Sequence, residues 1–554
     1  MKKIISFVLS SFLLHIGLVQ AQLDISQQNI EPQLPTWEAS MFMRYGKITP
    51  SLYTGTVNYS IPFYTYKDND FEIPISFDYA SNGYKTNSRR GSLGHDWSLS
   101  AGGIITRQIN GIPDEKIESV SNIQGAVTTV YGFSYAYEDI NKDVSIESPL
   151  GYSSYFDSSN KINMAHIYNN KIYDPEPDLF SFNFMGYSGS FHFWYNGKIQ
   201  ILETSGFSTG IKVKFHIVNQ KIAHITLTTP DGYKYQFGEG LSYDNFTEYF
   251  PQKDNNNITT IAWKLSSITA PNGREVSFNF GYKGLKKNNP IPKNYYYYMI
   301  IPNAEPSPPS DGLVLNNNTI ISEPLTSITI SGGANINLSY TLYNEEKFIY
   351  RGIIEKAFTN TELLDRISVE HNGNIIKTCD LKYKYSKSDT YLTSSVGNNV
   401  PFLSSVKISG EKAYELNYYD NNLLPYLGSL SYDHWGYYNG RSNSLDPEDI
   451  TRFLFYNEYN YTETLNSTKK DPDPNFARLG MLRRIDYPTG GYTEFEYEPH
   501  DYWAYISRNA ESHYSPELTN GNKNQVTGGL RIRKIINYDE NYNFTDSLSY
   551  YYLN

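Results

Sequence analysis

Residues 265–280 read LSSITAPNGREVSFNF, and residues 482–497 read LRRIDYPTGGYTEFEY. Both segments hold a leucine, an isoleucine three positions later, a Pro-x-Gly step and then aromatic or apolar residues at alternate positions. Alternation on both sides of such a turn predicts two antiparallel strands joined by a tight hairpin, in which glycine supplies the positive φ. This hairpin is the unit from which we derive the fold.

Further copies of the hairpin occur along the chain. Residues 325–340 keep the same frame without the proline, residues 227–237 hold a shorter copy, and looser copies span 364–373 and 403–418. The predicted turn glycines are Gly232, Gly273, Gly333, Gly373, Gly410 and Gly490. Because one hairpin alone is only marginally stable, such units must stack side by side. We therefore predict an all-β fold, an extended antiparallel sheet of stacked hairpins with a spiral or shell-like form.

The composition agrees with a large β protein and excludes some functions. Of the 554 residues 39% are hydrophobic, but 52 of these are tyrosines, so tyrosine must form part of the core. The net charge of −11 argues against nucleic-acid binding, which needs clustered Lys and Arg. Cys379 is the single cysteine, which excludes an intramolecular disulfide, and we expect it to be a small buried apolar residue.

The first residues have the pattern of a signal peptide. Met1-Lys2-Lys3 is basic, residues 4–19 are mostly apolar, and small residues precede a predicted cleavage between Ala21 and Gln22. The apolar run is shorter than a membrane-spanning helix needs, although an uncleaved anchor is the alternative. We expect an exported protein, periplasmic, cell-surface or extracellular, with no transmembrane segment after signal removal.

Short motifs, nearly all of them outside the repeat, are spread over nearly the whole mature chain. They are Tyr45-Gly46, Ser51-Leu52-Tyr53-Thr54-Gly55-Thr56, Ile61-Pro62, Leu93-Gly94, Trp97-Ser98-Leu99, Ala101-Gly102-Gly103-Ile104-Ile105-Thr106-Arg107, Gly111-Ile112-Pro113-Asp114-Glu115, Glu176-Pro177-Asp178-Leu179-Phe180, Asp433-His434-Trp435-Gly436-Tyr437-Tyr438-Asn439-Gly440, Tyr487-Pro488-Thr489-Gly490-Gly491 and Gly528-Gly529-Leu530-Arg531-Ile532. With these motifs the sequence resembles the N-terminal half of the Rhs (YD-repeat) proteins of Bacteroidetes. The resemblance implies a β-sheet that spirals into a shell, as in the related insecticidal-toxin and teneurin shells. In that family the shell can enclose a C-terminal toxic domain, which is released by self-cleavage at a core motif containing Asp-Pro.

The sequence departs from the Rhs pattern in three places. His95-Asp96 stands where a glycine is expected before the tryptophan. Tyr419-Asp420 and Tyr538-Asp539 carry the YD dipeptide but lack the glycine three residues later. The core motif is absent, so self-cleavage is not carried over to Asp471-Pro472 or Asp473-Pro474.

We divide the chain into a signal peptide (1–21), an N-terminal β-rich domain (22–210) and a repeated hairpin region (211–554) that we expect to be truncated before the Rhs core. Residues 547–553 form an aromatic run without charge or proline, the profile of an exposed strand edge that pairs with another chain. The expected partners are therefore the remainder of an Rhs shell or a second copy, joined through this C-terminal edge.

The sequence offers little that is typical of catalysis. It contains no G-x-S-x-G, H-E-x-x-H, P-loop or dinucleotide motif, and we expect no cofactor and no metal. The acidic segments Asp174-Pro175-Glu176-Pro177-Asp178 and Asp68-Asn69-Asp70 lack the spacing of a calcium loop, so we interpret them as solvated turns. In Asp433-His434 we expect a turn-capping or packing histidine. Two acidic residues on distant strands leave no local trace, so a glycosidase stays open.

One aromatic group is a candidate contact surface. Trp435, Tyr437 and Tyr438 could present rigid rings to a glycan or a cell-surface protein, or could form a buried corner, which we favour. The sequence is thus best interpreted as an exported, non-enzymatic β-shell protein with a structural, encapsulating or surface-interaction role. The alternatives are an exported carbohydrate-binding or carbohydrate-degrading protein, and a remnant of a longer toxin-delivering Rhs protein.

Overall fold

The computed structural model describes residues 54–552 except for 87–90, 122–126, 135–151, 154–164, 169–170, 175, 194–198, 204–209, 240–246, 251–258, 282–284, 293–314, 344–347, 351–352, 356–360, 388–398, 421–423, 426–430, 442–469 and 510–511. The predicted cleavage site at Ala21 and Gln22 therefore lies outside the described residues.

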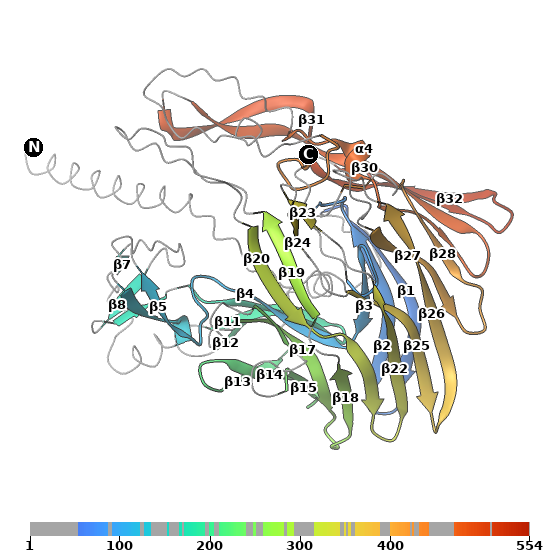
Figure 1. Cartoon of the computed structure of the whole chain (residues 1–554), viewed down its shortest axis with the longest axis horizontal. Helices are drawn as coiled ribbons and strands as arrows, with labels where there is room; N and C mark the ends of the chain where they lie inside the picture. The colour runs from blue at the N-terminus through green and yellow to red at the C-terminus, as the bar shows by residue number, and fades with distance from the viewer. Residues whose placement is uncertain are drawn as a thin grey trace, which may run out of the picture.

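One long antiparallel sheet, which we call the wall, dominates the molecule. Its strands, in order of pairing, are β13 (Lys212–Ile217), β14 (Ile222–Thr228), β15 (Lys234–Phe237), β17 (Thr259–Thr269), β18 (Glu275–Phe280), β21 (Leu325–Ile330), β22 (Ala334–Tyr343), β25 (Thr361–His371), β26 (Asn374–Lys387), β27 (Asn399–Ile408), β28 (Tyr414–Tyr418), β29 (Leu482–Asp486), β30 (Tyr492–Asn509), β31 (Ser512–Tyr538) and β32 (Phe544–Ser549). Each strand pairs with the next, and the sheet curves as it proceeds (Figure 1). This confirms the predicted all-β sheet of stacked hairpins.

The turns of the wall repeat one backbone geometry. In turn 229–233 the N–H of Gly232 donates to the carbonyl of Thr229 (2.9 Å), and the N–H of Thr229 donates to the carbonyl of Tyr233 (3.0 Å). Turns 270–274 and 487–491 make both bonds again, and their glycines have φ values of 86° and 92°. Only glycine adopts this left-handed conformation without steric cost, which explains the glycine in each copy.

The remaining predicted turn glycines fall in turns as well, with one shift of position. Gly373 and Gly410 have φ values of 77° and 84°. In the turn after β21, however, the left-handed residue is Gly332 (φ 68°), one position before the predicted Gly333. Gly333 instead donates its N–H to the carbonyl of Ile330 at 2.9 Å, and a Cβ at Gly333 would collide with the hydroxyl of Tyr66.

A row of β-bulges crosses the wall. At each bulge a leucine or isoleucine lies opposite an aromatic residue of the neighbouring strand, and the residue that follows the leucine or isoleucine is extra. The six pairs are Phe237 with Leu265, Phe280 with Leu325, Tyr340 with Leu364, Tyr383 with Leu403, Tyr418 with Leu482, and Tyr497 with Ile532. A bulge bends its strand and increases the local twist, so bulges aligned across many strands bend the whole sheet. This row gives the curvature of the wall a physical cause.

Tyrosine hydroxyls complete the backbone hydrogen bonding along this row. The hydroxyl of each tyrosine donates to the carbonyl of the leucine or isoleucine on the strand before it. The bonds run from Tyr340 to Leu325 (2.6 Å), Tyr383 to Leu364 (2.7 Å), Tyr418 to Leu403 (2.5 Å), Tyr497 to Leu482 (2.7 Å) and Tyr552 to Ile532 (2.8 Å). Burial raises the pKa of Tyr383 and Tyr497 well above the usual value, so their hydroxyls keep the proton that they donate. Tyrosine thus buries its ring without leaving its hydroxyl unpaired.

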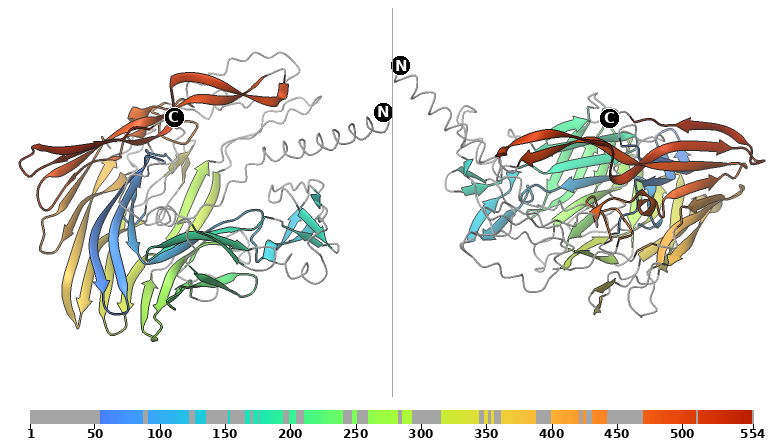
Figure 2. Two further views of the ribbon diagram at one scale, coloured as in Figure 1. Left: turned by 180° about the vertical axis from the view of Figure 1, so that it is seen from behind. Right: turned by 90° about the horizontal axis from the view of Figure 1, so that it is seen from above.

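A three-stranded sheet lies against the wall and completes the core. It consists of β1 (Val57–Lys67), β2 (Glu72–Ser81) and β3 (Trp97–Ala101), paired in that order. These blue strands lie beside the wall in both Figure 1 and Figure 2. Ile61, Phe77 and Trp97 are fully buried there, in one apolar cluster with Ile328 and Ile485 of the wall. Burial of alternate residues therefore joins the two sheets.

The turn between β1 and β2 connects the three-stranded sheet to the turns of the wall. The guanidinium of Arg274 pairs with Asp68 (2.8 Å) and with Asp70 (2.5 Å). The hydroxyl of Tyr233 donates to the carbonyl of Asp70 at 2.6 Å, and Asn272 donates to its carboxylate. The segment is a turn, as expected, with Asn69 exposed and with Asp68 and Asp70 partly exposed. What the sequence did not reveal is that residues of the distant wall pair with these two carboxylates.

A second group of strands continues from the start of the wall. It contains β4 (Gly103–Gln108), β10 (Leu179–Phe184), β11 (Tyr187–Phe193), β12 (Ile199–Glu203), β16 (Thr247–Phe250), β19 (Leu285–Pro292) and β20 (Leu315–Ser322). Strand β17 belongs to both groups, since its residues 262–264 pair with β4 and its residues 267–269 pair with β18. Because β4 lies before the predicted boundary at residue 210 and β17 lies after it, their pairing joins the two sides of that boundary by hydrogen bonds.

Smaller elements complete the described structure. One sheet orders β5 (Ile117–Ser121), β6 (Val127–Tyr131), β9 (Lys171–Tyr173), β8 (Ala165–Tyr168) and β7 (Tyr152–Ser153), and its β6–β9 pair is parallel. Strands β23 (Phe348–Tyr350) and β24 (Ile353–Glu355) form a hairpin. The short helix α4 (Pro474–Ala477) begins after Asp473, whose side chain caps it. Among the described residues, no helix has the length and apolar character needed to cross a bilayer.

Candidate functional site

The aromatic loop, residues 431–441, is the candidate site, and an aspartate organises its backbone. The carboxylate Oδ1 of Asp433 accepts the N–H of Trp435 (2.8 Å) and of Tyr437 (3.0 Å). The N–H of Asp433 donates to the carbonyl of Tyr437, and Gly436 takes a φ of 87° inside this turn. Asp and Gly at these two positions are therefore required by the turn itself. The cap of this turn is therefore Asp433 and not the expected histidine. Of the two roles expected for His434, capping or packing, only packing is seen, since its exposed ring lies edge-on to Trp435.

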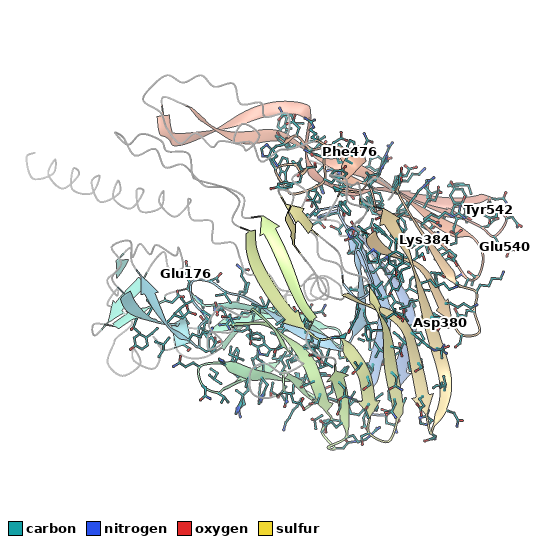
Figure 3. All side chains as sticks on the ribbon, in the orientation of Figure 1. Glu176, Asp380, Lys384, Phe476, Glu540 and Tyr542 are labelled. Carbon is teal, nitrogen blue, oxygen red and sulfur yellow. The ribbon has the colours of Figure 1, made fainter. Side chains whose placement is uncertain are left out.

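The three aromatic residues predicted as one contact patch lie in different environments. Trp435 is 46% exposed, whereas Tyr437 is 6% exposed and Tyr438 is half-buried. Phe476 of α4, labelled in Figure 3, packs edge-on against Tyr438 at 5.4 Å between ring centroids. The prediction that these residues form a buried corner therefore holds for Tyr437. Trp435 is instead the ring that the loop exposes to solvent.

Three glycines from two distant segments make room for Tyr437. A Cβ atom would lie 2.8 Å from this ring at Gly83, 2.9 Å at Gly528 and 3.0 Å at Gly529, which are closer than ordinary contacts. Lys85 places its ammonium 4.6 Å from the ring centroid. The glycine motif near residue 528 and the aromatic loop are therefore two parts of one packing arrangement.

The same corner connects the loop to the start of the described chain. The N–H of Leu530 donates to the carbonyl of Asn82 (2.7 Å), and the N–H of Ile532 donates to the carbonyl of Gly55 (2.8 Å). A side chain at Gly55 would collide with Arg531 and Tyr552. Motifs that lie hundreds of residues apart in the sequence thus meet at one corner.

Two ionisable groups, Asp433 of the aromatic loop and Lys470 beside it, are buried. Lys470 donates to the carbonyl of Tyr432 (3.1 Å), and its ammonium lies 3.8 Å from that ring centroid. Burial lowers the pKa of Lys470 to about 8, and burial raises the pKa of Asp433. The Oδ2 atom of Asp433 is shielded from solvent and has no hydrogen-bond partner among the described residues. The site therefore combines the exposed indole of Trp435 with two polar groups, Asp433 and Lys470, that are shielded from solvent.

A second polar cluster, which we call the Arg107 cluster, consists of Arg107, Asp114, Glu115, Asp174 and Asp178. The guanidinium of Arg107 is fully buried, donates to both oxygens of Glu115 (2.9 and 2.5 Å) and donates through Nε to Asp178 (2.8 Å). Asp178 also accepts the N–H of Asn110 and of Asp114. Asp174 accepts the N–H of Ile112 at 2.6 Å.

The Arg107 cluster contradicts the interpretation of residues 174–178 as a solvated turn. Asp174 is 1% exposed and Asp178 is fully buried. Burial raises the pKa of Asp174 and Asp114, and it raises the pKa of Asp178 to about 6 even though Arg107 acts in the opposite direction. Three sequence motifs, which end at Arg107, at Glu115 and at Phe180, converge here. Their acidic residues hold backbone N–H groups and one guanidinium in place.

The other residues singled out from the sequence have structural positions. Cys379 is fully buried and burial raises the pKa of its thiol to about 12, which agrees with a small apolar core residue. No group of three or more His, Cys, Asp or Glu side chains in the described part of the chain is arranged to hold a metal ion.

Sequence reasoning missed the tyrosine–carbonyl bonds, although a signal was present. In three copies the tyrosine follows the leucine by 15 residues, as in Leu325 and Tyr340, Leu403 and Tyr418, and Leu482 and Tyr497. The alignment of the repeats contained both residues but treated them only as apolar positions.

Comparison with known proteins found similarity only at the level of structure. No family model and no curated protein sequence matches this chain. The N-terminal domain of effector protein SpvB from Salmonella typhimurium is similar with a TM-score of 0.27 at 10% identity, over 64% of this chain and 99% of that domain. TcdB2-TccC3 without its hypervariable C-terminal region aligns with a TM-score of 0.31 at 11% identity, over 71% of this chain but 17% of that one. The Photorhabdus luminescens Tc holotoxin pore aligns with a TM-score of 0.31 at 11% identity, over 66% of this chain and 16% of that one. These TM-scores are low, and they support no statement about the activity of this chain.

Proposed function

We propose that this chain is an exported structural protein of Rhs type, whose curved wall forms part of a β-shell and which has no catalytic activity of its own. The observation that supports the proposal is the continuous row of bulges. Each hairpin contributes one bulge and pairs with the next hairpin, so the repeats build an extended curved surface. A surface of this kind suits encapsulation or the display of a contact site.

Electron microscopy of the purified protein, together with N-terminal sequencing of the exported product, tests this proposal. We expect a curved sheet whose concave side holds β1–β3, and a mature chain that begins at Gln22. Turnover of a glycan panel by the purified protein, lost on replacing one acidic residue, would contradict the non-enzymatic role.

We propose that β32 is the edge through which the wall joins another strand, either of a further shell segment or of a second copy. All six residues of β32 are exposed, including Phe544 (60%) and Leu548 (56%). Light scattering at increasing concentration should show association that Leu548→Lys reduces. The control is Ile376→Lys, which changes an equally exposed residue (54%) away from β32. Equal association of both variants would contradict a role for β32.

The second candidate function is glycan binding at the aromatic loop, and the exposed indole of Trp435 favours it. The turn around Asp433 fixes the backbone of Trp435, so binding through this residue would cost less conformational entropy than binding through a flexible loop. A glycan array should show binding that is lost in Trp435→Ala and kept in Trp503→Ala, since Trp503 is equally exposed (48%). Binding that survives Trp435→Ala would exclude this loop as the site.

A further inference from the structure

Strand β32 is the open end of the wall. Among the described strands it pairs with β31 alone, and it lies at the edge of the sheet in Figure 1. The N–H of Tyr550, one residue beyond β32, donates to the carbonyl of Arg533 at 2.9 Å. Backbone polar groups of successive residues point to opposite sides of a strand, so those of Ser547 and Ser549 point to the open side. Since β32 contains no lysine or proline to block pairing, these two serines offer their N–H and C=O groups to another strand.

The apolar side of the wall also ends at β32. Leu548 is the register partner of Ile535, and cross-strand partners share one face of a sheet. Ile535 packs against the apolar core cluster, so Leu548 lies on the core-facing side of the wall. Leu548 is nevertheless 56% exposed, because the described chain places no further strand beside it. An apolar side chain next to Leu548 would therefore extend the core by one strand.

We propose that the strand which pairs with β32 is β32 of a second copy, antiparallel to the first and related to it by a two-fold axis at Leu548. The pairing rests on the association through β32 proposed above, and it adds the identity of the partner and the register. Leu548 lies opposite the partner's Leu548, Ser547 lies opposite the partner's Ser549, and Asp546 lies opposite the partner's Tyr550. A two-fold contact uses the same surface on both copies, so the assembly closes as a dimer.

Charge and polarity favour this register over the neighbouring ones. An axis at Asp546 would set two aspartates directly opposite each other, which destabilises a strand pair. An axis at Ser547 would set each Leu548 against the partner's Asp546, an apolar side chain against a charged one. An axis at Ser549 would leave most of β32 outside the overlap of the two strands.

The axis at Leu548 avoids all three conflicts. The two leucines meet on the core-facing side, and each Asp546 meets a tyrosine, whose hydroxyl is a hydrogen-bond donor. Ser547 and Ser549 then form the hydrogen-bonded pairs, in agreement with the outward direction of their N–H and C=O groups. The two walls would thus continue into each other as one sheet.

Oxidative cross-linking of single-cysteine variants tests this register, because Cys379 is fully buried and does not compete. In the proposed dimer the two Leu548 residues form a non-hydrogen-bonded pair, with Cα atoms about 4.5 Å apart. A disulfide spans Cα separations of about 4.4–6.8 Å, so Leu548→Cys should yield a covalent dimer on air oxidation. The matched control is Thr545→Cys, which is equally part of the exposed strand. The two-fold axis places its two copies six residues apart, roughly 20 Å, so no disulfide should form.

Analytical ultracentrifugation of the wild type and of the reduced variants separates failure of this register from failure of the proposed association. The wild type and both reduced cysteine variants should sediment as dimers and form no larger species. If they associate and Leu548→Lys prevents association, but Leu548→Cys cross-links no better than Thr545→Cys, the two-fold register is wrong and the role of β32 stands. Assemblies larger than a dimer would also overturn the two-fold register. If the wild type stays monomeric at every concentration, the proposed association through β32 fails together with the register.

Discussion

The wall and the Arg107 cluster are stabilised by different kinds of polar interaction. Along the wall one small device is repeated, a tyrosine hydroxyl bonded to the backbone carbonyl of a leucine or isoleucine on the preceding strand. At the Arg107 cluster a single guanidinium and several carboxylates are buried together. The repeated tyrosine–carbonyl hydrogen bond is local and involves no charged group. The Arg107 cluster occurs once, and its stability depends on every one of its charged members.

The difference shows how stability is distributed in this fold. Loss of one tyrosine hydroxyl affects one hairpin and its neighbour, because solenoid-like sheets are held by nearest-neighbour contacts. Loss of one partner in the cluster leaves charges buried without compensation. Copies of the hairpin within the wall also differ. Phe280 occupies the bulge position that tyrosine occupies in later copies, and it has no hydroxyl to donate.

The largest effect is expected for Arg107→Ala. The change leaves Asp178 and Glu115 buried without their cation, and breaking a buried ion pair in this way costs about 3–5 kcal/mol. Urea unfolding should show this loss. Arg366→Ala is the control, because Arg366 pairs with Asp380 at the surface, where such pairs contribute about 0–1 kcal/mol. Similar losses for both variants would show that the cluster is no more important than a surface pair.

Stability should depend on pH through the acidic members of the Arg107 cluster. Burial raises the pKa of Asp178 to about 6 and also raises that of Asp114, so the folded state holds protons that the unfolded state releases. The resulting stabilisation is complete below the unfolded pKa, near 4, and is lost as the pH rises through the folded pKa. Each proton so held changes the free energy of unfolding by about 1.4 kcal/mol per pH unit within this window.

Urea unfolding between pH 4 and pH 7.5 measures that dependence. In Asp114→Asn, which removes one titrating carboxyl but keeps an oxygen for the N–H of Asp178, the slope should be smaller than in the wild type. An unchanged slope would show that the protons are held elsewhere.

A smaller, local effect is expected for Tyr497→Phe. The ring stays, but the carbonyl of Leu482 loses its buried donor, which costs about 1–3 kcal/mol. Tyr551→Phe serves as the control, because Tyr551 is 88% exposed. A loss below that of the control would mean that another group replaces the hydroxyl.

The reciprocal change, Phe280→Tyr, sharpens the comparison within the wall. It places a hydroxyl where later copies have one, within reach of the carbonyl of Leu265 by analogy with Tyr340 and Leu325. One added hydrogen bond should raise the free energy of unfolding by about 0.5–1.5 kcal/mol. Destabilisation would show that the Phe copies pack the ring differently, for example because Lys264 lies over it at 5.1 Å.

The smallest effect is expected at the turn between β31 and β32. Tyr542, labelled in Figure 3, has a φ of 64° in the position where other hairpin turns have glycine. Tyr542→Gly should stabilise the protein by about 1 kcal/mol or less, since it removes the left-handed strain while losing ring contacts with Tyr492. Tyr542→Ala keeps the strain and loses the ring, so it should be less stable than the glycine variant in thermal unfolding.

Much of the wall was predictable because its information is local. Alternation around residues 265–280 and the glycines at 232, 273 and 490 define strands and turns within a few residues of each other. The partners of the two acidic segments could not be predicted, for the opposite reason. Asp68 meets Arg274, and Asp178 meets Arg107, across long separations, so no spacing rule could reveal those partners.

The sequence by itself determined the all-β class, the hairpin unit and the turn positions, because periodicity and positive-φ glycines act within one hairpin. The tertiary structure alone decided which polar residues are buried, since burial depends on distant strands that cover them. It separated Trp435 from Tyr437 in exposure although they are two residues apart. It also aligned the leucines and tyrosines into one row, because strand register converts separate local bulges into a continuous bend of the sheet.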